Sequence, residues 1–293
     1  MEKLNREKIT EIVRQALRED IGKRDITTSF TIAALAKGEA AIIAKEKGIL
    51  CGIKIAKEVF EELDPHHSFK SFLKDGQKFI KGKKIALIKG RLRAILTAER
   101  VALNLLALLS GIATATGELV EKIEATKVKL LDTRKTTPLL RDLEKYAVRI
   151  GGGYNHRSSL SDAIIIKDNH LRASKCTEKG KLNEKELAKT IQLIKKKTHI
   201  RIEVEVENLT EFKAVLSCKP QVIMLDNFSP AQLKEAVALR NKQFPSVKLE
   251  ASGGITAANI HTVAHTGVDF ISAGSITHSP KAIDFSLEIT KTD

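Results

Sequence analysis

The sequence predicts an α/β protein whose larger part is a (β/α) barrel. The chain has 293 residues, 42% of them hydrophobic, with no Trp and only 2 Tyr, so its core is expected to be aliphatic. From residue 128 onward, short apolar segments alternate with helical ones, which is typical of a parallel sheet. Nearly every apolar segment ends in a polar or charged residue. A barrel gathers such strand ends around one mouth, whereas an open sheet spreads them along an edge, so the barrel is favoured.

The N-terminal part predicts a smaller α+β domain. Apolar residues at helical spacing predict a helix over 8–18 that ends at residues 19–22. Between residues 38 and 89, short apolar runs alternate with glycine-containing turns, as in a small sheet with one or two helices. Residues 96–123 have a strongly helical pattern. We expect this helix to be interrupted at Ser110-Gly111 and to lead into the next domain.

The barrel is expected to contain six recognisable strands, each with a chemically active residue at its end. The predicted strands are 128–131, 163–166, 202–206, 222–225, 247–249 and 268–271, and the residues at their ends are Asp132, Lys167, Glu205, Asp226, Ser252 and Ser272.

The charge of the chain favours an anionic partner. Lys and Arg total 50 against 36 Asp and Glu, which gives a formal net charge of +14. Much of the lysine lies in short runs such as 81–84 and 195–197, which are typical of a solvated surface. No nucleic-acid-binding motif accompanies the charge. We therefore expect an acidic metabolite rather than nucleic acid.

Cysteine usage and the N-terminus favour the cytoplasm. Cys51, Cys176 and Cys218 are far apart and form no CxxC pair, as expected in a reducing compartment. Residues 2–14 contain no apolar signal segment, and we expect no stretch of the chain to span a bilayer.

The segment DTRKTTP, residues 132–138, has the composition of an anion-binding loop. Arg134 can clamp a carboxylate or phosphate with two hydrogen bonds, Lys135 supplies a compact charge, and the threonine hydroxyls are neutral donors. Pro138 is expected to open a helix at its first turn. An exposed basic turn is the alternative interpretation.

A second cluster, GGGYNHR at residues 151–157, joins a flexible backbone to His156 and Arg157. A triple glycine can also be a plain linker, but the adjoining polar residues favour a functional loop. Ten residues later a strand ends in Lys167, which is a candidate ligand at the barrel mouth. His170 follows it, and we interpret that histidine as structural.

Carboxylates are expected inside the barrel. Glu203, Glu205 and Glu207 alternate along one strand and therefore point to one side. They could hold Mg²⁺ or sugar hydroxyls, or pair with the cations above. Glu205 and Asp226 lie near strand ends and are the candidate catalytic carboxylates, whereas Glu203 is expected to pair structurally. Because no His or Cys accompanies them at zinc-ligand spacing, Mg²⁺ is the only metal expected.

Two glycine-containing turns follow the last two strands. Backbone amides in such turns form phosphate cradles, a recurrent feature of the last two strand loops of barrels. Together they predict a phosphate-bearing ligand, bound at Ser252, Gly253 and Gly254 and at Ser272, Ala273 and Gly274.

These motifs, taken in order, resemble the quinolinate phosphoribosyltransferases. The segments that carry the resemblance are DTRKTTP, GGGYNHR, IIIKDNH, EVEVEN, MLDNF, EASGGI and ISAGSITHS, with EDIG, DIT and AERVALN upstream. The likeness covers nearly the whole chain. It implies transfer of phosphoribosyl from 5-phosphoribosyl 1-pyrophosphate to quinolinate with loss of carbon dioxide, which gives nicotinate mononucleotide for NAD biosynthesis.

The resemblance also implies the architecture. It implies an incomplete seven-stranded (β/α) barrel over residues 116–275 and an N-terminal α+β open sandwich over residues 1–115, which the C-terminal segment 276–293 joins. The assembly implied is a homodimer whose active sites are shared between subunits.

Site roles follow from the same resemblance. Arg134, Arg157 and Lys167 would face the carboxylates of quinolinate, joined by Arg100 of the neighbouring subunit. Lys135 and His156 would lie at the pyrophosphate and the reaction centre. Glu205 and Asp226 would hold ribose hydroxyls and Mg²⁺, and the two glycine turns would bind the 5′-phosphate.

One departure from the family pattern is a long charged segment over residues 172–185, which is interpretable as a lid or as a solvated insertion. The alternative functions are a related molybdenum-transport-associated or nicotinate-type phosphoribosyltransferase, or a non-catalytic barrel that binds a phosphate ligand. Four candidate cations for two carboxylates favour the dicarboxylate substrate.

Overall fold

The computed structural model describes residues 5–178 and 181–293, and the chain divides into two compact units. The first unit contains Met1–Gly117, Thr136–Gly152 and Ile276–Asp293. The second contains Glu118–Lys135 and Gly153–Ser275. The segment 136–152 therefore packs with the N-terminal part of the chain although barrel elements flank it in sequence.

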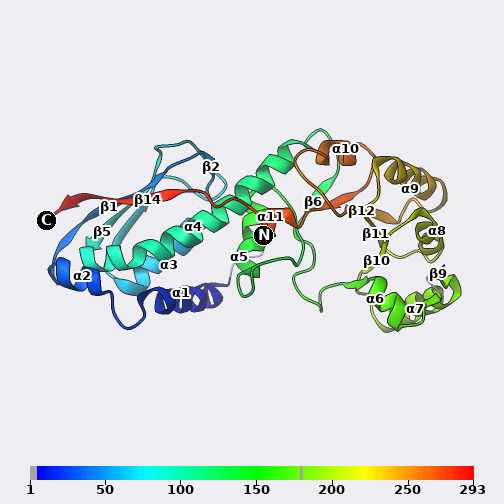
Figure 1. The fold of residues 1–293 in the computed structure, drawn as a ribbon, viewed down its shortest axis with the longest axis horizontal. Coiled ribbons are helices and arrows are strands. Elements are labelled where there is room, and N and C mark those ends of the chain that lie inside the picture. The colour runs from blue at the N-terminus through cyan, green and yellow to red at the C-terminus, as the bar shows by residue number, and fades with distance from the viewer. Residues whose placement is uncertain (1–4, 179–180) are drawn as a thin grey trace. The chain divides into compact units, whose positions relative to one another are not determined.

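The first unit is built on a four-stranded antiparallel sheet. Its strand order is β14(Phe285–Thr292), β1(Lys37–Ala44), β5(Lys84–Arg91) and β3(Ser68–Ser71). Strand β14 comes from the extreme C-terminus and lies against β1, with Leu287 opposite Ile42 (Figure 1). A short ribbon pairs β2(Gly48–Ile49) with β4(Lys78–Phe79).

Local sequence signals set the ends of the N-terminal helices. Helix α1(Arg6–Ile21) is capped by the Asn5 side chain and ends at Gly22, whose φ is +58°. Helix α2(Ile26–Thr31) is capped by Asp25, which accepts from the Thr28 backbone N–H. Helix α3(Ile53–Leu63) packs against α1.

The helix predicted over 96–123 is longer and is not interrupted. Helix α4 runs from Leu92 to Glu121 without a break, so the expected interruption at Ser110-Gly111 is wrong. Ser110 is used for packing, because its hydroxyl donates to the Cys51 carbonyl and accepts from the Cys51 N–H. Position 111 requires glycine, because a Cβ at this position would overlap the backbone carbonyl of Lys281. Both residues bring other backbone close to a continuous helix.

Helix α4 also corrects the expectation about membrane spans. By length and composition it could cross a membrane, and 61% of its most apolar window is buried within the protein, as in a core helix. Arg100 and its neighbours interrupt the apolar pattern of this helix, so the sequence shows no uncharged run long enough to span a bilayer here.

The helix expected at Pro138 begins three residues later. Helix α5 spans Arg141–Ile150, and residues 138–140 form a turn. Leu139 in that turn has φ +69°, a left-handed conformation that an L-residue other than glycine adopts at a cost. The helix therefore cannot start at Pro138. Buried Glu144 accepts from the Thr137 N–H and so fixes the turn onto α5.

The second unit contains a parallel sheet that curls into an incomplete barrel. The strands are β6(Lys129–Leu131), β7(Ile164–Ile166), β10(Ile202–Val206), β11(Val222–Asp226), β12(Lys248–Ser252) and β13(Phe270–Ser272). Their order in the sheet is β6-β13-β12-β11-β10-β7, so the first strand lies beside the last. On the free edge of β6, Tyr154 forms a parallel bridge with Leu131 in place of a seventh strand. This confirms the predicted incomplete seven-stranded barrel, with one strand reduced to a bridge.

Helices and a hairpin follow the barrel strands (Figure 1). The helices are α6(Asp168–Ala173), α7(Glu184–Lys197), α8(Leu209–Ser217), α9(Pro230–Gln243), α10(Ile260–Ala264) and α11(Ser275–His278). Within the charged segment 172–185, β8(Thr177–Glu178) pairs with β9(Lys181–Leu182). Residues 179 and 180 of that segment lie outside the described part of the chain. Asn183 then caps α7.

Candidate active site

The carboxyl ends of the barrel strands bring the predicted polar residues to one edge of the sheet. Asp226 is paired in register with Ser252 on the neighbouring strand. Ser272 is paired with Leu131, which precedes Asp132. Because all six strands are parallel, these positions lie at the same end of the barrel.

Lys167 and Glu205 form an ion pair at this end. Lys167 follows β7 and Glu205 lies in the adjacent strand β10, and the lysine ammonium contacts the glutamate carboxylate directly. The Glu205 side chain is 13% exposed and that of Lys167 is 43% exposed. The family resemblance implies different ligands for these two residues, whereas their ion pair is the alternative that the strand pattern left open.

His170 has the structural role expected of it. Its Nδ1 accepts from the Lys167 backbone N–H at 3.1 Å, which ties the first turn of α6 to the end of β7.

Asp132 fixes the loop that carries His156. The aspartate is fully buried, and it accepts from the His156 backbone N–H at 2.8 Å and from the Asn155 side-chain amide at 2.6 Å. The two segments GYNHR and DTRK are therefore held together by a buried charge-assisted network.

His156 points into the barrel interior. Its Nε2 lies 3.1 Å from a carboxylate oxygen of Glu203 and 3.5 Å from one of Glu250, and all three residues are buried. Glu203 therefore has the structural partner that the sequence analysis expected. Glu250 was missed, because it lies two positions before the end of β12 among apolar neighbours, and no local pattern distinguishes it.

The protonation of this cluster follows from two constraints. Burial by itself lowers the pKa of His156, but the hydrogen bonds to Glu203 and Glu250 raise it to about 9 and so favour a doubly protonated ring. The Arg157 backbone N–H, however, donates to Nδ1 at 2.8 Å, and an acceptor nitrogen carries no proton. The amide always carries its hydrogen, whereas a proton can move to Glu250, whose pKa is raised by burial and by the charge of Glu203. We therefore assign a neutral ring with its proton on Nε2.

This assignment decides whether the cluster is a metal centre. His156, Glu203 and Glu250 have ligand atoms within 4.8 Å of one another, close enough to surround an ion. A histidine binds a metal through an unprotonated nitrogen, and here Nε2 carries the ring proton. In this protonation state the three residues form a hydrogen-bonded cluster.

Arg134 and Arg157 place two cations close together beside this cluster. Burial lowers the pKa of Arg157, and the nearby charge of Arg134 lowers it further. Arg157 is fixed by donation from Nη1 to the Ala163 carbonyl at 2.9 Å. The charges of Glu203 and Asp162 offset the repulsion from Arg134 in part, and a further anion beside the two guanidinium groups would offset more of it. The arrangement is therefore suited to an anionic ligand.

Lys135 and Arg100 are both exposed. The Lys135 backbone N–H donates to the Thr133 hydroxyl, which shapes the loop after β6. Arg100 belongs to the first unit, where it lies on α4.

The first glycine turn depends on Asn227, which sequence reasoning missed. Gly253 has φ +89°, and a Cβ on it would overlap the Asn227 side chain. The Asn227 N–H donates to the Ser252 carbonyl at 2.8 Å, and its Nδ2 donates to Asp226 at 2.9 Å. Asn227 itself has φ +57°, a conformation that asparagine tolerates better than most residues. An asparagine directly after a strand-end aspartate was the available signal.

The second glycine turn, at residues 272–274, has a backbone amide that already donates within the protein. The Ala273 N–H donates to the Leu131 carbonyl at 3.0 Å, so this amide is used by the sheet. Ser272 is buried, and the Ser275 hydroxyl donates to the Ile255 carbonyl at 3.3 Å. Of the three predicted residues here, Ala273 is therefore the least suited to donate to a phosphate.

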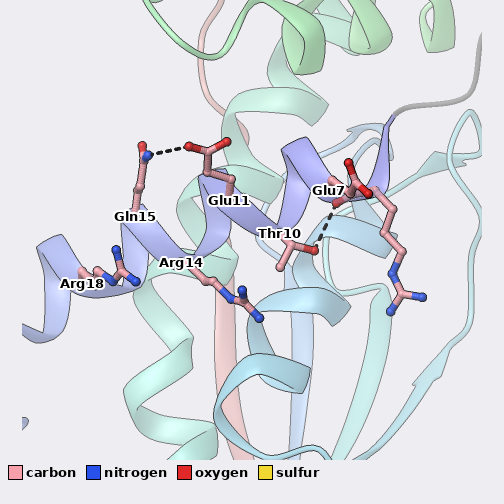
Figure 2. Close-up of a pocket in the computed structure, with 7 residues that line it drawn as sticks. Glu7, Thr10, Glu11, Arg14, Gln15 and Arg18 are labelled. Atoms are coloured by element: carbon pink, nitrogen blue, oxygen red, sulfur yellow. Dashed lines mark hydrogen bonds between the residues drawn. The ribbon is translucent and has the colours of Figure 1, made fainter.

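A shallow pocket on α1 is unrelated to these residues. Figure 2 shows its side chains along one face of the helix, where Gln15 donates to Glu11. Arg14 forms two hydrogen bonds with Glu62 of α3, and Thr10 donates to Glu58. These contacts serve the packing of α1 on α3.

The fold is that of a (β/α)-barrel enzyme, and basic side chains gather at the carboxyl ends of its strands. Two models of the quinolinate phosphoribosyl transferase family match the chain: the N-terminal domain over residues 25–110 and the C-terminal domain over residues 112–288. The chain belongs to this family.

Individual relatives agree over almost the full length. The chain is 37% identical over 280 residues to the nicotinate-nucleotide pyrophosphorylase (carboxylating) of Mycobacterium leprae, covering 94% of this chain and 95% of the relative. It is 39% identical over 297 residues to a mitochondrial quinolinate phosphoribosyltransferase (decarboxylating) of Nicotiana tabacum, covering 96% and 82%. The solved nicotinate-nucleotide pyrophosphorylase of Francisella tularensis is 42% identical, with a TM-score of 0.88 and 98% of each chain covered.

Proposed function

We propose that this protein is a decarboxylating quinolinate phosphoribosyltransferase. It transfers phosphoribosyl from 5-phosphoribosyl 1-pyrophosphate to quinolinate and produces nicotinate mononucleotide, pyrophosphate and carbon dioxide in NAD biosynthesis. Family membership over both domains carries this proposal. The paired guanidinium groups of Arg134 and Arg157 support it, because a dicarboxylate would relieve their repulsion.

Quinolinate would bind against the cationic side of the barrel mouth. Arg134 and Arg157 would each take a carboxylate, with Lys167 beside them and Arg100 supplied by the second subunit of a homodimer. Lys167 already pairs with Glu205, so the substrate carboxylate would share or replace that partner. Binding would thus release Glu205 toward the ribose.

The phosphoribosyl donor would occupy the other side of the mouth. Exposed Lys135 suits the pyrophosphate, and Glu205 and Asp226 suit the ribose hydroxyls. The 5′-phosphate would bind at the turns Ser252 to Gly254 and Ser272 to Gly274. Ala273 would contact it only by packing, because its backbone amide already donates to the sheet. His156 would support the reaction centre from beneath, since its ring is buried and hydrogen-bonded to Glu203.

Mg²⁺ fits the carboxylates of the mouth only in part. Glu205 is held by the Lys167 ammonium, which disfavours a second cation on the same group. Asp226 is half-buried at the strand end and accepts one neutral amide hydrogen bond, so it is the better ligand. The ion would neutralise charge on the departing pyrophosphate. Full activity in excess chelator would remove the metal from this account.

The chemistry needs no further cofactor. The pyridine nitrogen bonds to the ribose carbon as pyrophosphate leaves, and Glu205 and Asp226 offset the positive charge that develops on the sugar. The ring nitrogen is then quaternary. The adjacent carboxylate can leave as carbon dioxide because the cationic ring accepts the electron pair, and that carbon takes a proton from solvent.

The test is turnover with alternative acceptors. The protein, 5-phosphoribosyl 1-pyrophosphate and Mg²⁺ are incubated with quinolinate or with nicotinate, and the nucleotide product is measured. We expect product from quinolinate and little from nicotinate. Preference for nicotinate would favour the monocarboxylate enzyme, and donor binding without product would favour a non-catalytic sensor. We place the protein in the cytoplasm, although the tobacco relative is mitochondrial.

A further inference from the structure

We infer that Glu203 and Glu250 are positioning residues that act through His156. They hold the ring proton on Nε2, so that Nδ1 can accept a hydrogen bond from the Arg157 backbone N–H. This hydrogen bond orients Arg157 toward the substrate. The inference rests on the proposed role of Arg157 as a carboxylate ligand. It assigns a task to two buried carboxylates that have no part in the proposed function.

The two carboxylates reach His156 from different strands. Glu203 lies in β10 and Glu250 in β12, with β11 between them, and both side chains enter the barrel interior. Glu203 is fully buried and Glu250 is 1% exposed. Each presents its Oε2 to the same ring nitrogen.

This arrangement does not serve stability well. The Oε1 atom of Glu203 is buried without a hydrogen-bond partner among the described residues, whereas Glu250 has the Ser272 hydroxyl beside it. A buried polar atom left in that state is destabilising, and apolar residues in its place are often tolerated or stabilising. Besides His156, Glu203 has Arg201 at 3.9 Å, and its charge also reaches Arg157, where it raises the pKa of the guanidinium. Two such carboxylates on one imidazole therefore indicate that their role is to fix the position of the ring proton.

The ring in turn fixes the segment that carries Arg157. Asp132 accepts from the His156 backbone N–H at 2.8 Å, and His156 Nδ1 accepts from the Arg157 backbone N–H at 2.8 Å. The peptide before Arg157 is thus held on both sides. If the proton moved to Nδ1, two donors would face each other and the Arg157 amide would turn away.

The first test uses apolar replacements, which avoid leaving a single buried charge. In a Glu203→Met, Glu250→Met double variant the ring proton is no longer held on Nε2. We expect the KM for quinolinate to rise about three- to tenfold, as for loss of one hydrogen bond, with the KM for the phosphoribosyl donor unchanged. Leu249→Met is the matched control, because Leu249 is a fully buried neighbour in β12. An unchanged quinolinate KM in the double variant would overturn the proposal.

The second test is rescue by His156→Asn in the double-variant background. An asparagine oxygen occupies the place of Nδ1 and accepts the Arg157 N–H without needing a particular tautomer. We expect the quinolinate KM to return toward the wild-type value. His156→Gln places its amide near Nε2 instead and should not rescue. Equal effects of the two substitutions would contradict the positioning role.

A third measurement does not depend on turnover. Nitrogen NMR of histidine-labelled protein at pH 7 reports the protonation of each ring, and the His156 signals are those lost in His156→Asn. We expect a neutral ring with its proton on Nε2 in the wild-type protein and loss of this preference in the double variant. A doubly protonated ring in the wild-type protein would overturn the inference, while absence of quinolinate turnover alone would count against the proposed function only.

Discussion

The side chain of Asn227 occupies the space where a Cβ on Gly253 would lie, so the loops after β11 and β12 fit together only with glycine at position 253. The same asparagine donates to Asp226 at 2.9 Å. A change at Gly253 is therefore transmitted to the carboxylate that we propose to hold the ribose and Mg²⁺.

Gly253→Ala should raise the KM for the phosphoribosyl donor about tenfold or more, because the new Cβ displaces Asn227 and with it Asp226. Gly82→Ala is the matched control. Gly82 also has a positive φ, but a Cβ there meets nothing within 4 Å and it lies outside the proposed site. Backbone strain without displacement costs about 1 kcal/mol in stability and should change the donor KM less. Equal donor KM values in the two variants would contradict the coupling of Asn227 to Asp226.

Arg157→Ala and Arg134→Ala should each weaken quinolinate binding by about 1.5 to 3 kcal/mol, since each removes a charge-assisted contact to a carboxylate. Donor affinity should change much less. Calorimetry with each ligand separately measures both quantities. Parallel losses for the two ligands would argue against a dicarboxylate site at this pair.

Asp269→Ala tests the ion-pair network among β12, β13 and α9. Asp269 accepts from Arg240 at 2.6 Å, from Lys248 at 2.8 Å and from the Leu249 N–H at 3.0 Å. Arg240 is buried, so loss of its partner should cost about 3 kcal/mol in the free energy of unfolding. Asp293→Ala removes an exposed pair with Lys291 and should cost under about 1 kcal/mol.

The pH dependence of this network has a definite sign. Burial by itself raises the pKa of Asp269, but the contacts with Lys248, the Leu249 N–H and Arg240 outweigh it and lower the pKa. A lowered folded-state pKa gives stability that is present above the unfolded value of about 4 and is lost as pH falls through the folded value. Denaturant unfolding at several pH values should show the difference between wild type and Asp269→Ala shrinking below about pH 4. A constant difference would contradict the assignment.

Arg100 is proposed to act in the active site of the neighbouring subunit. If so, inactive Arg100→Ala and Lys135→Ala homodimers should rescue each other under subunit exchange, because a heterodimer has one site with both lesions and one with neither. Random mixing should restore up to about a quarter of wild-type activity. No recovery, despite heterodimers shown by mass spectrometry, would place Arg100 in its own subunit or outside the site.

Strand patterns could be predicted well because apolar runs in a parallel barrel are local signals. Strands β10 and β11 begin where the sequence analysis expected, and Glu203 has a structural partner. Glu250 could not be predicted, because its role depends on a histidine that lies almost a hundred residues away in sequence. The same holds for Asn227, whose importance arises from a glycine on the next strand.

Helix boundaries failed where tertiary contacts outweighed local propensity. Ser110 and Gly111 look like a break in sequence, yet they allow other backbone to approach an unbroken helix. Helix α5 begins after Leu139 because Leu139 adopts a left-handed backbone conformation. A leucine in the sequence does not predict that conformation. In the first case backbone from elsewhere in the fold decides the local structure, and in the second a left-handed residue within the turn does.

The most direct test of the proposed activity follows the carboxylate that should leave. Quinolinate labelled with carbon-14 in the carboxylate next to the ring nitrogen is incubated with the protein, 5-phosphoribosyl 1-pyrophosphate and Mg²⁺. The account predicts labelled carbon dioxide, nicotinate mononucleotide and pyrophosphate in equal amounts, and retention of label when the other carboxylate carries it. Nucleotide that retains the label next to the nitrogen, or consumption of the donor without release of carbon dioxide, would contradict it.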